Sequence, residues 1–300
     1  MIFPFITSIK LASKAYEKHS PKYKKKQQWK ILFYTLLNPV FSDKWFKFIK
    51  SPEFYNIYLH RTRIYIKPFR PYISTKWNKK QKVKVITDTY RFLQTKNLLN
   101  KILSNNLIIS NIKFNDQQNG ILKLEYDERF RKEGELVLTF ECNNCGGKIM
   151  SVAFSFKETH NKNWDCIVGC VQGHCNKEYF NLSQKLLNRM RPNSFIIFSL
   201  QEFVRNLNCN NIFCAGNAIQ ANQKKHFINI KKIHKINFDY NKFYEEAGAV
   251  KYNDNWYKLP LKPKLKDIET IKSKKRNLYR KRYKMLDEIS IQIKNNTTLL

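Results

Sequence analysis

The sequence is short of acidic residues. Its 300 residues hold 23 Asp or Glu against 56 Lys or Arg, a formal net charge of +33. A charge of this size implies contact with an anionic partner such as nucleic acid, anionic lipid or a phosphate-bearing ligand. Arg is also scarce, because 44 of the basic residues are Lys, and Asn, Ile, Phe and Tyr are abundant. This composition is typical of an AT-rich genome, so we do not expect specific nucleic-acid binding from the charge alone.

Long apolar runs are absent as well. No stretch of about eighteen apolar residues occurs, which predicts no transmembrane helix. The first twenty residues lack the basic n-region and A-x-A site of a secretory signal. Seven cysteines, an odd number, are typical of reduced thiols in a cytosolic protein. We therefore expect a cytoplasmic protein, with peripheral association at the inner membrane as a further expectation.

Common catalytic motifs are missing too. No P-loop, GxGxxG, Ser-His-Asp or Cys-His arrangement is recognisable. Cys142 and Cys145 form a C-x-x-C in CNNCGGK. A zinc site is one interpretation, but a hairpin turn is favoured because Asn and Gly supply positive φ. Cys166 and Cys170 fall in a predicted strand with a spacing that would point both side chains the same way. We assign no metal site.

The hydrophobic pattern predicts an α+β protein with a boundary near residue 105. Hydrophobic residues make up 42% and aromatics 14% of the chain, enough for a core. Residues 1–105 indicate a helical N-terminal region, although 64–73, with two prolines, should be extended. Residues 106–300 indicate a body with a mostly antiparallel sheet and flanking helices. Strands are expected at 108–114, 121–126, 135–141, 149–156, 166–173, 211–216 and 256–260, and helices at 181–190, 192–208, 239–249 and from about 273 onward.

The segment 271–289 holds eight Lys or Arg in nineteen residues. Leu278, Tyr283, Leu286, Ile289 and Ile293 follow a helical spacing, so one side should pack against the body. Three of the twelve Arg concentrate here, which codon bias does not explain, and Arg suits phosphate recognition. We predict an anion-binding face, with solvated helix surface as the alternative. Its residues would be Lys274, Lys275, Arg276, Arg280 and Arg282, together with Arg189 and Arg191 at a predicted helix junction.

Several segments together carry a resemblance to a known family. They are 67-KPFRPYI-73, 135-ELVLTFE-141, 151-SVAFSF-156, 168-VGCVQG-173, Arg191-Pro192, 200-LQEF-203, 243-FYEEAGA-249, 256-WYKLP-260 and 272-KSKKRNLYRKRY-283. In this order they are similar to the VirK/YbjX family of bacterial proteins over roughly residues 30–290. The resemblance implies a contribution to virulence, envelope modification and resistance to cationic antimicrobial peptides, but no defined reaction. Cys170 and Ala249 depart from the family, which favours Gly at these places.

The segment FYEEAGAVKYNDNWYKLP resembles the late helix and strand of GNAT-type acyltransferases. This likeness implies a splayed strand at 166–173, pyrophosphate at the next helix N-terminus, and an acyl-CoA cofactor. Acyl or aminoacyl transfer to an envelope component is the leading hypothesis. Its candidate catalytic residues are Gln172, beside Gly173 where backbone could approach closely, and Tyr244 and Glu245 on the late helix. For each, a structural role is the alternative: a turn, the core or the surface.

The N-terminus raises a second hypothesis. The apolar residues Ile2, Phe3, Phe5, Ile6, Ile9 and Leu11 precede Lys22, Lys24, Lys25 and Lys26. Such a segment can lie on a membrane, or it can dock on its own domain. The chain would then be a non-catalytic factor that binds anionic lipid or a protein partner through a basic face. The pattern predicts no oligomeric state.

Overall fold

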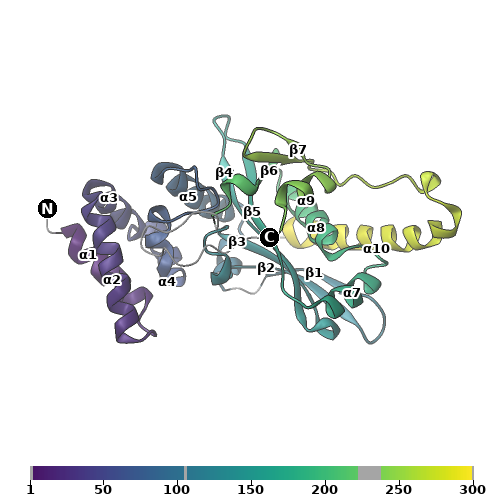
Figure 1. Ribbon diagram of the computed structural model, residues 1–300, viewed down its shortest axis with the longest axis horizontal. Coiled ribbons are helices and arrows are strands. Elements are labelled where there is room, and N and C mark those ends of the chain that lie inside the picture. Colours follow the sequence, from purple (N-terminus) through teal and green to yellow (C-terminus); the bar gives the residue numbers. More distant parts are fainter. Residues whose placement is uncertain (1–2, 105–106, 222–237, 299–300) are drawn as a thin grey trace. The chain divides into compact units, whose positions relative to one another are not determined.

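The chain divides into two compact units in a computed structural model that describes residues 3–104, 107–221 and 238–298. The helical unit comprises Met1–Pro71 and Asn78–Lys82, and the sheet unit comprises Tyr72–Trp77 and Val83–Leu300. Helices make up the N-terminal part, and a mostly antiparallel sheet follows (Figure 1). The predicted α+β class is therefore confirmed.

The helical unit begins its helices at prolines. α2, α3 and α4 each carry Pro in the first turn, where the missing N–H has no intrahelical partner to lose. Its core includes Ile31, Trp45, Phe46, Ile49 and Tyr65. The elements are α1 (Phe3–Ala15), α2 (Pro21–Leu36), α3 (Pro39–Ile49), α4 (Pro52–His60) and the 3-10 helix η1 (Thr62–Phe69). None of the described helices, in either unit, has the length and apolarity that crossing a membrane requires.

The expectation of an extended segment at 64–73 is wrong over most of its length. Residues up to Phe69 form the 3-10 helix η1, with Pro68 inside it. A 3-10 turn uses a φ close to that of proline, so Pro does not exclude it. All six residues from Ile64 to Phe69 are buried. This burial on every side hides the periodicity that would otherwise indicate a helix.

The sheet unit is built on eight strands in the order β1-β2-β3-β4-β5-β6-β8-β7. All neighbours pair antiparallel except β5 and β6, which are parallel. The strands are β1 (Leu107–Lys113), β2 (Asn119–Glu125), β3 (Leu136–Cys142), β4 (Gly147–Glu158), β5 (Trp164–Gly173), β6 (Asn211–Ala215), β7 (Val250–Lys251) and β8 (Trp256–Leu259). The seven predicted strands are all present, and β7 is an addition.

Helices cover the sheet on the face that carries Phe140 and Phe154. The Phe195 and Phe203 rings of α8 lie 5.0 and 6.1 Å from these two rings. α10 runs beside α8 and along β1, where Gln292 accepts a hydrogen bond from the Asn111 N–H. The helices of this unit are α5 (Lys79–Thr95, which begins in the helical unit), α6 (Leu99–Leu103), α7 (Lys177–Leu186), α8 (Pro192–Asn206), α9 (Tyr240–Glu246) and α10 (Ser273–Thr298), with 3-10 turns η2 (Glu128–Phe130), η3 (Asn143–Cys145), η4 (Asn217–Ile219) and η6 (Ile268–Thr270).

A bulge at Gly169 changes which side chains of β5 point to each face of the sheet. Cys170 pairs with Ala153, whereas Val168 pairs with Phe154, so Gly169 is an extra residue opposite the β4 backbone. Cys166 and Cys170 therefore point to opposite faces, and the expectation that they share one is wrong. A Cβ at Gly169 would lie 1.9 Å from the Glu133 carbonyl oxygen. The close backbone approach expected at Gly173 thus occurs at Gly169 instead. A Cβ at Gly173 would lie 3.4 Å from Met150 Sδ and 3.9 Å from the Ile149 carbonyl oxygen, which are ordinary contacts.

Candidate functional site

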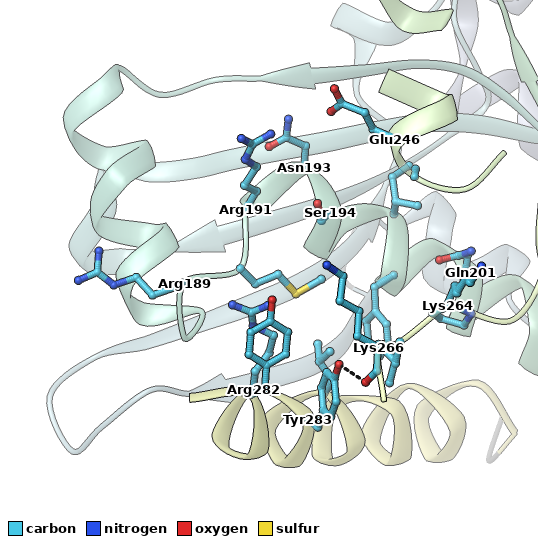
Figure 2. A pocket seen from close by; sticks show the side chains of 18 of the residues that line it. Arg189, Arg191, Asn193, Ser194, Gln201, Glu246, Lys264, Lys266, Arg282 and Tyr283 are labelled. Carbon is cyan, nitrogen blue, oxygen red and sulfur yellow. Dashed lines mark hydrogen bonds between the residues drawn. The ribbon is translucent and has the colours of Figure 1, made fainter. Parts of the chain in front are cut away.

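A pocket of about 630 Å³ opens between α8, α9 and α10 of the sheet unit. This volume is within the range of sites that hold a cofactor or a drug-sized ligand. Four segments line it (Figure 2): the α7–α8 turn, the first turns of α8, the end of α9 and the loop 263–266 with α10. Its residues are Arg189, Met190, Arg191, Asn193, Ser194, Ile197, Phe198, Gln201, Phe243, Glu246, Ala247, Pro263, Lys264, Leu265, Lys266, Tyr279, Arg282, Tyr283 and Leu286.

The polar part of the pocket is strongly basic. Five Lys or Arg line it against one acid, Glu246. α8 begins here with Pro192, and no side chain caps its N-terminus. The N–H groups of Asn193 and Ser194 precede the first intrahelical bond, which Phe195 makes to the Arg191 carbonyl. Orphan N–H groups and the helix dipole favour a bound anion at this end.

Asn193 adds an acceptor to the same region. Its Oδ1 atom is buried and has no hydrogen-bond partner in the part of the chain that the structure describes. A buried acceptor without a partner is destabilising unless a ligand or water donates to it. A ligand that combines an anionic group with an N–H or O–H donor would satisfy both features.

Arg282 connects α10 to the α7–α8 turn. Its Nε and Nη2 atoms donate to the Asn188 carbonyl at 3.1 and 2.8 Å, and its guanidinium lies 4.3 Å from the Tyr279 ring centroid. Asn188 and Arg189 both have positive φ, 49° and 63°, a conformation that favours glycine. The turn is therefore held in a costly conformation, with α10 as its support.

Apolar side chains form the other part of the pocket. Ile197, Phe198, Phe243 and Leu286 are buried, and Leu265 is exposed at its edge. Tyr283 closes the loop side, because its hydroxyl donates to the Lys266 carbonyl at 2.7 Å (Figure 2). The pocket is thus amphiphilic, with cations and a helix N-terminus beside an apolar surface.

Three of the seven predicted anion-binding residues line this pocket. Arg189 and Arg191 belong to the α7–α8 turn and Arg282 to α10, about ninety residues later in the sequence, and the Arg189 guanidinium points away from Arg282 (Figure 2). Lys274, Lys275, Arg276 and Arg280 do not line it. Arg276 instead donates to the Ile271 and Glu269 carbonyls. Lys264 and Lys266 were not predicted, since a loop with alternating Lys carries no signal beyond its position before α10.

The predicted catalytic residues lie outside the pocket. Gln172 is exposed near the end of β5, opposite Ser151. Tyr244 is fully buried, burial raises its pKa well above the usual value, and its hydroxyl has no partner among the described residues. Glu245 is exposed and accepts a hydrogen bond from the Tyr257 hydroxyl at 3.2 Å. The acid that does line the pocket is the next residue, Glu246.

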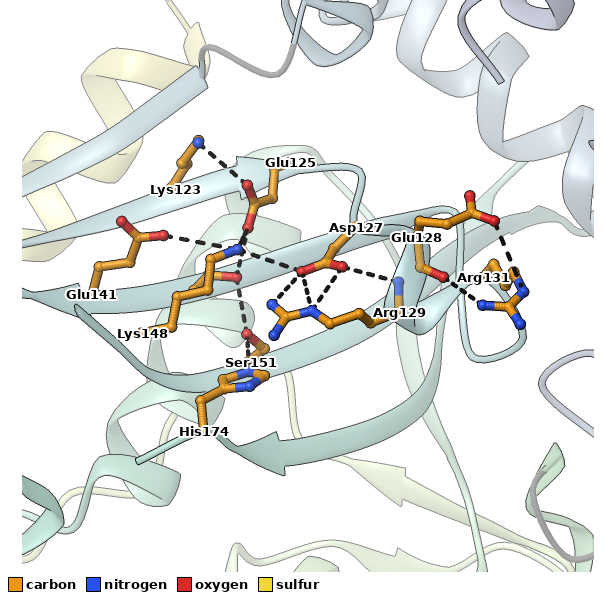
Figure 3. Close-up of polar contacts among 11 residues, drawn as sticks. Lys123, Glu125, Asp127, Glu128, Arg129, Arg131, Glu141, Lys148, Ser151 and His174 are labelled. Carbon is orange, nitrogen blue, oxygen red and sulfur yellow. Dashed lines mark hydrogen bonds and ion pairs between the residues drawn. The ribbon is translucent and has the colours of Figure 1, made fainter. Parts of the chain in front are cut away.

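A second polar cluster lies on the opposite face of the sheet (Figure 3). Lys148 forms an ion pair with Glu125 and lies 3.4 Å from Asp127 and 3.9 Å from Glu141. Thr139 links Glu125 to Ser151, and Ser151 Oγ lies 2.8 Å from His174 Nε2. Thr139 alternates with Phe140, whose ring contacts α8, so this network faces away from α8.

Charge and burial tune the titrating groups of this network. Burial lowers the pKa of His174 to about 4, and the charges of Arg129 and Lys148 act in the same direction. The pKa of Asp127 is lowered to about 2, because the hydrogen bonds and charge of Arg129 outweigh the raising effect of burial. Ser151 is fully buried, so the Ser151–His174 pair offers no exposed nucleophile. We assign the network a structural role.

The C-x-x-C segment forms the predicted hairpin turn. Cys142 pairs with Gly147 across β3 and β4, and Gly146 and Gly147 have positive φ. Both thiols are buried, with Sγ atoms 2.7 Å apart. Burial and the neighbouring Cys142 raise the pKa of Cys145 to about 12, the reverse of a reactive thiol. Among residues 3–104, 107–221 and 238–298, no three His, Cys, Asp or Glu are placed to hold a metal ion.

Comparison with known proteins assigns this chain to a family. The family described as "Protein of unknown function (DUF535)" matches residues 21–295. "Uncharacterized protein YbjX" of Escherichia coli (strain K12) is 25% identical over 272 residues, which cover 88% of this chain and 81% of the relative. An "Uncharacterized protein" of Haemophilus influenzae is 30% identical over 130 residues, 42% of each chain. No solved structure matches.

The match spans both units, from α2 into α10, and includes every residue that lines the pocket. It confirms the resemblance to VirK and YbjX that the sequence segments indicate. The chain belongs to the DUF535 family, the family of YbjX.

Proposed function

We propose that the pocket between α8, α9 and α10 binds a phosphate-bearing ligand with an apolar portion, of the class of an acyl-CoA. The observation that carries this proposal is the amphiphilic lining. Cationic side chains and the open N-terminus of α8 suit phosphate groups. The apolar side chains Ile197, Phe198 and Leu286 suit a chain attached to it.

The choice of an acyl-CoA follows from the GNAT resemblance. Parallel β6 is five residues long and pairs with Asp165–Val168, so the end of β5, up to Gly173, extends beyond it. The pocket lies at the N-terminus of α8 and not at that of α7, the helix that follows β5, so it differs from the pyrophosphate site that the resemblance implies. Fold-level analogy does not define a reaction. It makes acyl or aminoacyl transfer to an envelope component the activity we propose, and resistance to cationic antimicrobial peptides and virulence its proposed cellular outcome.

A direct test is calorimetric titration of the whole chain with palmitoyl-CoA, CoA, ATP and palmitate. We expect palmitoyl-CoA to bind more tightly than either the phosphate-bearing ligands or the fatty acid alone, since it uses both parts of the pocket. ATP measures attraction by charge alone. Equal affinity for ATP and palmitoyl-CoA would remove the acyl-CoA assignment, and release of free CoA from the thioester would establish turnover.

Arg282 and Arg276 form a matched pair of variants. Each is an α10 arginine whose Nε and Nη2 atoms donate to backbone carbonyls, but only Arg282 lines the pocket. Both Arg→Met changes should cost comparable stability, of order 1–3 kcal/mol. Arg282→Met should also weaken palmitoyl-CoA binding about 10- to 100-fold, the value of one charge-assisted contact. Equal affinities of the two variants would place the ligand elsewhere.

A phospholipid with an anionic headgroup presents the same chemistry. Competition separates the two sources: short-chain phosphatidylglycerol should displace palmitoyl-CoA if the pocket takes lipid. In that case the non-catalytic lipid-binding hypothesis replaces acyl transfer.

A further inference from the structure

The C-terminal half of α2 exposes more apolar side chains than it buries. α2 buries Gln27, Ile31 and Thr35. It exposes Trp29, Phe33 and Leu36, whose exposed fractions are 69%, 45% and 58%. These three residues recur at i, i+4 and i+7, so they share one side of the helix. A helix whose outer side contacts only water would bury its large apolar side chains and expose its polar ones, which is the reverse of this distribution.

Two more exposed apolar residues follow the last turn of α2 in the sequence. Leu37, with an exposed fraction of 61%, caps the helix, and Val40, at 68%, lies in the first turn of α3. We call these five residues the exposed stripe. Contiguous exposed apolar side chains mark surfaces that contact a membrane or a partner, whereas a lone exposed residue such as Ile291 on α10 needs no explanation.

Lysines extend the same side of α2 toward its N-terminus. Lys22, Lys25 and Lys26 precede Trp29 by seven, four and three residues, and all are exposed. The first turn of α2 has no acid and no side-chain cap. The N-terminus is the positive end of the helix dipole, and it repels the positive charges of these lysines. The arrangement is therefore unfavourable without a bound anion.

The helical unit as a whole has the same charge. It contains eighteen Lys or Arg but only three acids, Glu17, Asp43 and Glu53. Aromatic and aliphatic residues beside Lys are what a helix needs to lie in a membrane interface. Anionic headgroups would supply the missing negative charge.

We propose that the exposed stripe and its three lysines form a membrane-contact face for bilayers with anionic lipid. The rings of Trp29 and Phe33 enter the boundary between headgroups and acyl chains, and the lysines contact lipid phosphates. α1 plays a smaller part, because it buries Leu11 and leaves only part of its apolar surface, at Ile6 and Ile9, exposed. This inference does not depend on the pocket, which lies in the sheet unit.

The test is co-sedimentation of the whole chain with vesicles of phosphatidylcholine alone or with added phosphatidylglycerol. We expect binding to the anionic vesicles, decreasing with salt. Trp29 is the most exposed of the five tryptophans, so its emission should shift to the blue. The difference spectrum against Trp29→Phe isolates this signal.

Matched variants separate the stripe from general charge. Trp29→Ala with Phe33→Ala should reduce partition about tenfold or more. Val250→Ser with Ile291→Ser, at similarly exposed apolar positions in the sheet unit, should leave partition unchanged. A variant that combines Lys22→Gln, Lys25→Gln and Lys26→Gln should lose the preference for vesicles with phosphatidylglycerol. A control variant with the same charge change at Lys157, Lys185 and Lys281 should keep it.

Three outcomes would overturn the proposal. One is that the Trp29→Ala, Phe33→Ala variant binds vesicles as well as the wild type does, which would mean that charge alone drives binding. Another is equal loss in both lysine sets. The third is a concentration-dependent dimer that requires the stripe while vesicles do not bind, which would make a second copy the partner. Circular dichroism of each variant checks the fold, and since the changed residues are exposed, we expect it to be retained.

Discussion

Acidification should destabilise the sheet unit through His174. The imidazole is half-buried, with Nε2 2.8 Å from Ser151 Oγ and its ring edge-on to Phe130 at 5.8 Å. Burial, Arg129 and Lys148 lower its pKa to about 4, against about 6.5 in an unfolded chain. Between these values the unfolded chain binds a proton that the folded chain does not. The contribution of neutral His174 to the free energy of unfolding is therefore complete above pH 6.5 and is lost as the pH falls to 4.

The size of the loss follows from the shift. The difference between a pKa of about 6.5 and one of about 4 corresponds to about 3.4 kcal/mol. Because the ring is partly exposed, solvent screening reduces this, and we expect a loss of about 1–2 kcal/mol. Asp127, whose pKa is about 2, acts below about pH 4, so its effect falls in a separate window.

The measurement is urea unfolding at a series of pH values for the wild type and His174→Gln. Glutamine keeps a hydrogen-bonding group beside Ser151 but does not titrate. The wild type should lose about 1–2 kcal/mol more than the variant between pH 6.5 and 4. Parallel pH profiles, or a His174 titration midpoint near 6.5 by NMR, would refute the reasoning.

Two further changes probe the same sheet. Lys148→Met leaves Glu125 without its nearest cation and should lower the free energy of unfolding by about 2–4 kcal/mol in the same urea assay. The double variant Lys148→Met, Glu125→Gln should recover part of this loss. Gly169→Ala should cost about 3 kcal/mol or more, because the new Cβ meets the Glu133 carbonyl, whereas Gly173→Ala on the same strand should cost under about 1 kcal/mol. Thermal melts that rank the two glycine variants the other way would contradict the bulge.

The elements with clear periodicity could be predicted from the sequence. β3 and β4 alternate, and α10 carries Leu286, Ile289 and Ile293 on its buried side. The bulge could not be predicted, because one extra residue in β5 leaves the local pattern unchanged while turning Cys170 to the other face. η1 was missed because burial on all sides removes any period.

The candidate site was predicted in part. The Arg content pointed to α10 and to the α7–α8 turn, but sequence alone does not fix how far a helix rotates about its axis. Tyr279, Arg282, Tyr283 and Leu286 face the pocket, at helical spacing. Lys274 and Arg280 lie on other sides of α10, whereas Lys275 shares this side but lies one turn before Tyr279, outside the pocket. The part played by Lys264 and Lys266 depends on the course of a loop, which carries no periodic signal.

The support that Arg282 gives to the α7–α8 turn has a consequence for synthesis. The turn emerges from the ribosome about ninety residues before the arginine whose N–H groups hold its Asn188 carbonyl. Until α10 is made, the turn lacks that support and the pocket lacks one side. A ligand can therefore select only chains in which α10 has docked, and ligand binding would report completed folding of the sheet unit.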